Sequence, residues 1–118
     1  MDKIERYKNI LRKEMEYQAS LSFGNAADLH RHLIIGKDEM EFLLILKGWQ
    51  DEVYRHGVIF HFEIINDKVW LHENNTDSDI GTKLAELGIP KSDIVLGFVS
   101  NIEKPIEGYS PIPTRKAS

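Results

Sequence analysis

Apolar residues recur at spacings of three and four along the first twenty positions of the chain. The apolar residues in this pattern are Ile4, Tyr7, Leu11 and Met15. This spacing places them on one face of a helix, while Lys, Arg and Glu fill the other face, as is usual for a helix surface in contact with solvent. The pattern therefore predicts an amphipathic helix from Lys3 to about Ser20, with Asp2 as a favourable N-terminal cap.

Beyond a turn-rich segment at residues 21–28, the apolar pattern becomes that of strands. Leu29 to Gly36 is expected to form the first strand. Phe42 to Leu46 is continuously apolar, which predicts a central strand covered on both faces. A buried helical segment is the alternative for this run, but Gly36 and Gly48 limit it to the length of a strand.

The segment from Val53 to Ile65 predicts a longer strand, with Gly57 as a candidate for a bulge or kink. Two sets of side chains alternate along it with a period of two. One set is Val58, Phe60, Phe62 and Ile64, and the other is Ile59, His61, Glu63 and Ile65. Asn66-Asp67 then separates this strand from the apolar run Lys68 to His72, which predicts a tight hairpin because both residues tolerate positive φ.

The last third of the chain carries a short helix and then a tail. Ile80, Leu84 and Leu87 mark one helical face, and Gly88 followed by an apolar residue and a proline is a helix stop. Ile94 to Phe98 is expected to be a short extended or irregular segment. The sequence thus predicts an α+β fold with an N-terminal helix, an antiparallel sheet of about four strands, and a second short helix on one sheet face. Residues 1–100 form one domain in this interpretation, and residues 101–118 form an irregular, proline-containing tail.

Length, charge and cysteine content narrow the functional classes. A chain of 118 residues fits one domain, and its composition is that of an ordinary globular protein. Its net charge of −4 argues against strong DNA binding by the chain alone. The absence of cysteine excludes disulfides and thiolate chemistry and fits a reducing compartment. With neither a bilayer-spanning apolar run nor a signal peptide in the sequence, we expect a soluble, cytoplasmic protein.

The five histidines raise two chemical possibilities. His30 and His32 project from one face of a strand, and with His61, His72 or Glu73 on neighbouring strands they could bind a metal ion, although no zinc-binding spacing is present. A pair formed by His61 and Glu63 would suit general acid–base chemistry, but cross-strand hydrogen bonding on a half-buried sheet explains the same residues. No nucleophile or nucleotide-binding motif accompanies them. We therefore expect no catalytic residues, no metal and no cofactor.

The two tryptophans suggest a binding surface instead. Trp49 and Trp70 could stack on nucleic-acid bases, but the charges around Trp70 are mixed, so packing in the core or at an interface is the better interpretation. The candidate interaction surface comprises Trp49, His61, Glu63, Trp70 and His72. A sheet with helices on one side leaves its other face uncovered, which favours either self-association or binding of another protein there.

Several segments, taken in order, resemble the XisI family. They are MDKIERY at 1–7, KGW at 47–49, GVIFHFEI at 57–64, DKVWL at 67–71 and LGIPKSDIVLGF at 87–98. Together they cover most of the chain. Residues 21–38 resemble the family less clearly, and the tail departs from it, because Val99 to Glu103 precedes the Lys104-Pro105 pair.

This resemblance implies a controlling factor in excision of the fdxN element, a programmed DNA rearrangement of heterocyst-forming cyanobacteria. It also implies a protein partner, because XisI-like proteins are typically paired with XisH-like proteins of the nuclease fold. The family supplies no catalytic residues to transfer to this chain. The resemblance therefore favours a non-catalytic regulatory protein that binds an XisH-like partner. The alternatives are an accessory DNA-binding protein and a histidine-dependent metal hydrolase.

Overall fold

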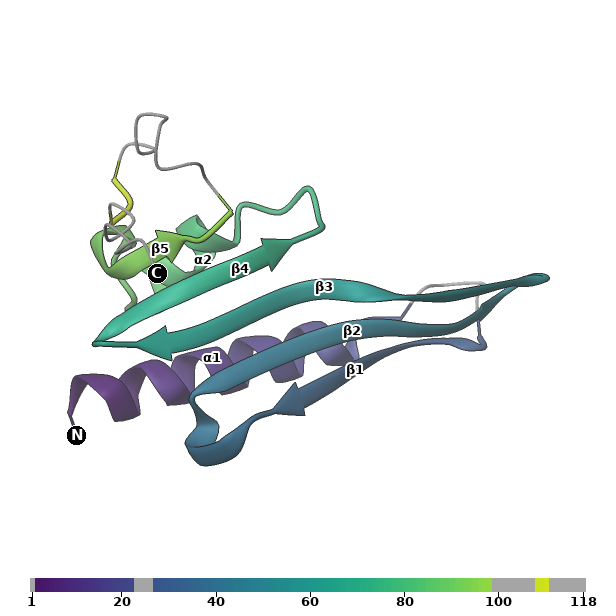
Figure 1. Ribbon diagram of the computed structural model, residues 1–118, viewed down its shortest axis with the longest axis horizontal. Coiled ribbons are helices and arrows are strands. Elements are labelled where there is room, and N and C mark those ends of the chain that lie inside the picture. Colours follow the sequence, from purple (N-terminus) through teal and green to yellow (C-terminus); the bar gives the residue numbers. More distant parts are fainter. Residues whose placement is uncertain (1, 23–26, 99–107, 111–118) are drawn as a thin grey trace, which may run out of the picture.

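The computed structural model describes residues 2–22, 27–98 and 108–110, and its centre is a twisted sheet beside two helices (Figure 1). The helices are α1 (Lys3–Ser20) and α2 (Ile80–Leu87), with short 3₁₀ helices η1 (Lys37–Glu39) and η2 (Lys91–Asp93). The strands are β1 (Leu29–Ile35), β2 (Glu41–Gln50), β3 (Val53–Ile65), β4 (Lys68–Asn74) and β5 (Ile94–Leu96). The α+β class and the order of the predicted elements are confirmed.

The sheet has one strand more than expected, and that strand changes its type. The strand order is β1-β2-β3-β4-β5, with antiparallel pairing from β1 to β4 and parallel pairing between β4 and β5. Because α2 carries the chain from β4 to β5, β5 enters the sheet in the same direction as β4. Ile94 and Val95 of this strand are fully buried. Three residues are too few to show a strand period, so the sequence pattern suggested only an extended or irregular segment.

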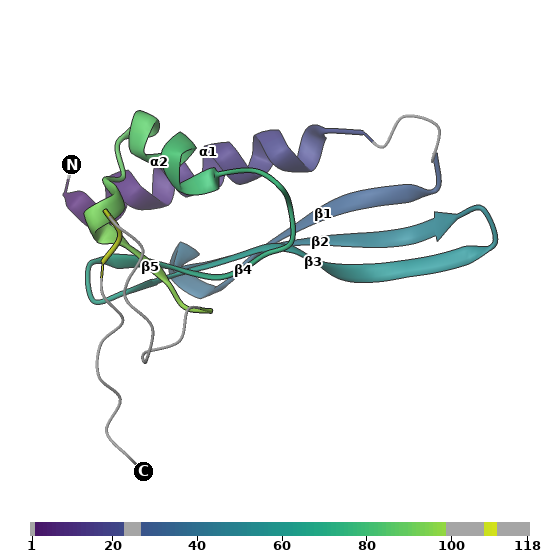
Figure 2. The ribbon, with the colours of Figure 1, turned by 90° about the horizontal axis from the view of Figure 1, so that it is seen from above.

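Both helices lie on the same side of the sheet, as predicted for the second helix (Figure 2). The core fills the space between the two layers. Its largest fully buried side chains include Tyr7, Leu11, Met15, Phe42, Phe60, Phe62 and Leu84. Three of these residues come from the predicted apolar face of α1, which is therefore confirmed as the buried face.

The start of α1 is fixed by a cap and by a partly buried carboxylate, that of Asp93. The Asp2 carboxylate accepts a hydrogen bond from the backbone N–H of Glu5 at 2.8 Å, as a cap does. The Tyr7 hydroxyl donates to Asp93 in η2, and Lys3 and Lys68 approach the same carboxylate at 2.9 and 3.1 Å. Burial alone would raise the pKa of Asp93, but these donors outweigh it and lower the pKa to about 2. This cluster joins α1, η2 and β4.

Two local predictions at turns are confirmed. Asn66 and Asp67 have φ of 48° and 64°, the backbone of a tight hairpin between β3 and β4. Gly88 has φ of 121°, and the N–H of Ile89 returns to the Leu84 carbonyl at 2.9 Å, which closes α2.

Two predictions about glycines in the strands are wrong. Gly48 does not end the central strand, because β2 continues through it to Gln50. A side chain at Gly48 would place its Cβ 2.0 Å from the Asp28 carbonyl oxygen, so the glycine allows the entry of β1 to lie against β2. Gly57 is not the bulge: Leu44 pairs with Phe60 but Ile45 pairs with Val58, so the extra residue is Ile59. The bulge turns Ile59 into the core, away from the face that carries His61 and Glu63.

The predicted tail falls mostly on residues outside the described ranges. Its described residues, 108–110, pack against α2 and β5: Ser110 bridges to Val95, and its N–H donates to the Ile94 carbonyl at 2.9 Å. Neither helix in the described part of the chain is long and apolar enough to span a bilayer.

Candidate interaction surfaces

The side of the sheet turned away from α1 and α2 carries most of the predicted site residues. Side chains of β1 to β4 that alternate with the core positions Phe42, Leu44 and Phe62 project from this side, which we call the open face. Cross-strand partners share a face, so the register assigns each residue to one side. All five histidines belong to the open face, namely His30, His32, His56, His61 and His72.

Two histidine–glutamate pairs lie side by side on β2, β3 and β4. His61 Nε2 is 2.8 Å from Glu41 Oε2, and His72 Nε2 is 3.0 Å from Glu63 Oε1. The two imidazole ring centres are 4.8 Å apart, and Trp70 lies 5.9 Å from the His72 ring. We call these five residues the His–Glu cluster. Four of the five predicted surface residues are therefore brought together.

The pairing inside the cluster is cross-strand, and its partners depend on the strand register. The cross-strand hydrogen bonding favoured by the sequence is present, since His61 pairs with Glu41 on β2 and Glu63 pairs with His72 on β4; the alternative pair of His61 with Glu63 on one strand is not formed. Across β3 and β4, His61 faces Glu73 while Phe62 faces Leu71, so His72 is an extra residue in β4. This bulge brings the His72 ring toward Glu63. Sequence analysis missed Glu41 because its proximity to His61 depends on the β2–β3 register.

The chemistry of the cluster is that of cross-strand hydrogen bonding. Both imidazoles and both carboxylates are partly exposed, with side-chain exposures between 26% and 46%. Residues 2–22, 27–98 and 108–110 contain no group of three or more histidine, aspartate or glutamate side chains arranged to hold a metal ion. His30 and His32 lie on β1, with β2 between them and His61. They do not join the cluster.

Trp49 lies away from the cluster, near the far end of the β2–β3 hairpin. We call this part of the hairpin, Leu46–Gln50 of β2 and Val53–Gly57 of β3, the arm; it extends beyond the end of α1 (Figures 1 and 2). Trp49 is opposite Tyr54, and the two rings meet edge to face with centres 5.3 Å apart. Trp49, Tyr54 and Val53 are each more than half exposed. Tyr54 was missed because its pairing with Trp49 requires the hairpin to be known.

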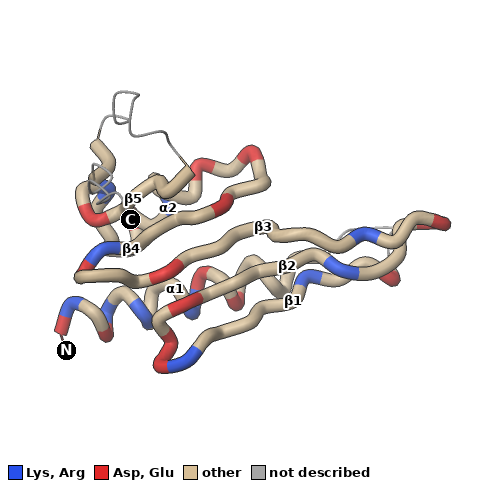
Figure 3. Tube along the Cα trace, viewed as in Figure 1, with Lys and Arg blue, Asp and Glu red and all other residues tan. Residues whose placement is uncertain are grey.

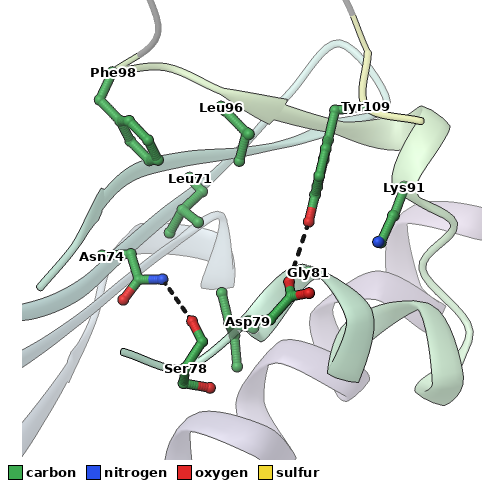
Figure 4. A pocket seen from close by; sticks show the side chains of 10 residues that line it. Leu71, Asn74, Ser78, Asp79, Gly81, Lys91, Leu96, Phe98 and Tyr109 are labelled. Atoms are coloured by element: carbon green, nitrogen blue, oxygen red, sulfur yellow. Dashed lines mark hydrogen bonds between the residues drawn. The ribbon is translucent and has the colours of Figure 1, made fainter. Parts of the chain in front are cut away.

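A separate pocket of about 330 Å³ lies between the start of α2 and strands β4 and β5 (Figure 4). The Tyr109 hydroxyl donates to Asp79, the N-cap of α2, at 3.4 Å. Burial and the neighbouring Asp79 raise the pKa of Tyr109, while hydrogen bonds from Thr82 lower the pKa of Asp79. A Cβ at Gly81 would lie 1.9 Å from the Tyr109 oxygen, so glycine is required for this contact. These contacts attach residues 108–110 to the domain.

The architecture defines a class of small α+β proteins in which two helices cover one face of a sheet and leave the other open. Within that class, the chain belongs to the XisI protein family, which matches it over residues 1–111. The resemblance noted in the sequence is thereby confirmed.

Two solved structures are similar over most of their length. A XisI-like protein from Anabaena variabilis is 25% identical, with a TM-score of 0.81 over 94% of this chain and 100% of that one. The fdxN element excision controlling factor XisI from Anabaena variabilis is 27% identical, with a TM-score of 0.69 over 84% of this chain and 95% of that one. None of the curated proteins matches the chain in sequence.

Proposed function

We propose that this protein is a non-catalytic controlling factor of DNA-element excision that acts by binding an XisH-like protein of the nuclease fold. Membership of the XisI family and the similarity to an fdxN element excision controlling factor support the biological role. The histidine and glutamate side chains of the His–Glu cluster are between 26% and 46% exposed on the open face, where a partner protein can reach them.

The exposed aromatic patch on the arm is the observation that carries the binding proposal. Trp49 and Tyr54 are 52% and 53% exposed, and as cross-strand partners they project from the same face of the arm, which extends beyond α1 (Figure 2). Trp and Tyr are the residues that most often dominate protein–protein binding energies, and an exposed apolar group of this kind is unfavourable in water unless a partner covers it. The arm therefore supplies an anchor for the XisH-like protein.

Co-purification with an XisH-like protein from the same genome tests the proposal, with an affinity tag on one protein only. Wild-type chain should form a stable complex. The double variant Trp49→Ser/Tyr54→Ser should weaken it by about a hundredfold or more, because each truncated anchor typically costs 2 kcal/mol or so. Isothermal titration calorimetry gives the affinity.

Tyr17→Ser provides a matched control, since Tyr17 on α1 is 55% exposed but lies outside the arm. Its affinity should equal that of the wild type. Thermal unfolding must show that both variants fold cooperatively. Absence of a complex between two folded wild-type proteins would reject the partner, and equal losses in the arm and control variants would reject the arm as its binding site.

A further inference from the structure

The open face has its charges sorted along the strands. At its arm end, His30, Lys47 and His56 form one row across three strands, because His30 pairs with Lys47 and Lys47 pairs with His56. At the other end, Glu41 and Glu63 are cross-strand partners. Figure 3 shows the Lys and Arg positions of β1 to β3 toward the arm and the Glu positions at the opposite ends of β2 and β3. Of the former, Lys47 belongs to the open face, whereas Arg31 and Arg55 pair with Leu46 and Gly48 on the other side.

Histidines lie at both ends of the open face, because His61 and His72 are hydrogen-bonded to Glu41 and Glu63, so the separation is between Lys47 and the glutamates. Glu73 on β4 faces His61 and adds to the acidic end. Lys68, at the same end, is paired with Asp93 at 3.1 Å. Asp51 and Glu52 lie in the turn beyond the basic row, outside the strands.

Between the two ends, the open face carries an apolar band together with His32 and His61, the cross-strand partners of Ile45 and Leu43. This middle band is formed by Ile34 on β1, Leu43 and Ile45 on β2, and Val58 on β3. Ile34 is 43% exposed. An apolar band flanked by polar groups is the usual anatomy of a protein interface, with the charged groups at its rim.

The spacing of the charges makes the face complementary to itself. Lys47 and Glu41 lie three residues on either side of Leu44, so each is roughly 10 Å along the strand from that position. Consider a two-fold axis between two facing sheets, perpendicular to the strands at the level of Leu44. It places Lys47 of each copy over Glu41 of the other, and His56 over Glu63, while the apolar bands meet in the middle.

We propose that the occupant of the open face is a second copy of this chain, packed sheet to sheet about this two-fold axis. Two-fold dimers are the commonest oligomers, and their interfaces must be self-complementary, as this face is. The other face-to-face arrangement, with the axis along the strands, would put the acidic ends together and is disfavoured by repulsion. Sheets packed this way lie about 10 Å apart, within reach of the lysine and glutamate side chains.

Charge reversal of the full-length chain tests the arrangement without any other protein present, so the result is independent of the XisH-like partner. Sedimentation velocity should show a dimer for the wild type at about 100 μM. Lys47→Glu and Glu41→Lys should each weaken dimerisation by about tenfold or more, because each reversal turns two symmetry-related attractive contacts into repulsive ones. Lys13→Glu makes the same charge change at an exposed residue of α1, on the side of the sheet away from the open face. It should leave the dimer intact.

Mixing the two reversed variants gives the decisive result. In a mixed pair, the glutamate introduced at position 47 of one chain meets the lysine introduced at position 41 of the other. At the second contact the unchanged Glu41 meets the unchanged Lys47, so both contacts are attractive again. A tagged Lys47→Glu chain should therefore capture untagged Glu41→Lys chain at wild-type affinity. Three results would each overturn the proposal. They are a wild type that is monomeric at about 100 μM, a dimer whose affinity neither reversal changes, and a mixture of the two folded variants that does not associate.

Discussion

The two halves of the β2–β3 hairpin differ in what their side chains contact. In the body, Phe42 of β2 and Phe60 and Phe62 of β3 are fully buried beneath the helices. In the arm, the same two strands continue with Trp49 and Tyr54, which are more than half exposed. The two strands stay paired through both halves, and the bulge at Ile59 lies where one half passes into the other. Cross-strand pairing thus extends beyond the helical cover, and the arm adds an exposed surface with little contribution to the core.

This difference separates residues needed for folding from residues available for binding. Burial of large apolar side chains supplies most of the folding free energy, so the body should dominate stability. An exposed aromatic pair contributes little to the core, so the exposed side chains of the arm can be changed at small cost. The predictions below test this separation, beginning with the largest expected effect.

Phe62→Ala should destabilise the protein by about 3–5 kcal/mol, because the substitution empties a fully buried site. Tyr54→Ala in the arm should cost less than about 1 kcal/mol, as expected for an exposed side chain with one aromatic neighbour. Urea unfolding followed by circular dichroism gives both values. Similar losses from the two substitutions would show that the arm belongs to the folding core.

Gly48→Ala should cost about 2 kcal/mol, since Gly48 has φ of 133° and a Cβ would collide with the Asp28 carbonyl. Gly57 is the matched control in the same arm, because a Cβ there would meet no atom within 4 Å. Gly57→Ala should be neutral or stabilising by up to about 1 kcal/mol. Thermal unfolding of both variants measures the contrast, and equal effects would exclude the close backbone approach of β1 as its cause.

The interactions of Asp93 with Tyr7, Lys3 and Lys68 should make the free energy of unfolding depend on pH in the acidic range. The pKa of Asp93 is lowered to about 2 from 3.8, so its contribution is complete above about pH 4 and is lost as the pH falls through 2. A shift of this size corresponds to about 2 kcal/mol. Asp93→Asn should therefore lower stability by about 1–2 kcal/mol at pH 6 but have little effect near pH 2.

Urea unfolding of wild type and Asp93→Asn at several pH values between 2 and 6 or so tests this dependence. Asp77→Asn is a control at an exposed aspartate. It should follow the wild-type profile. A constant difference between Asp93→Asn and wild type at all pH values would show that packing, and not the charge of Asp93, is responsible.

The sequence alone determined the features that depend on neighbouring residues. The apolar face of α1, the Asn66-Asp67 turn and the Gly88 stop of α2 all follow from contacts within about four positions, where spacing and side-chain chemistry act directly. The order of helical and strand-like apolar patterns along the chain was also sufficient to predict the α+β class. It further indicated that His61, Glu63, Trp70 and His72 belong to an exposed sheet surface.

Only the tertiary structure decided which distant residues meet. The bulges at Ile59 and His72 shift the strand registers, and these shifts pair His61 with Glu41 and His72 with Glu63. The continuation of β2 through Gly48 separates Trp49 from the cluster and places it opposite Tyr54. A strand's register depends on the packing of its whole apolar face against the helices, and a shift of one residue reverses every side chain. That choice is made by the assembled core.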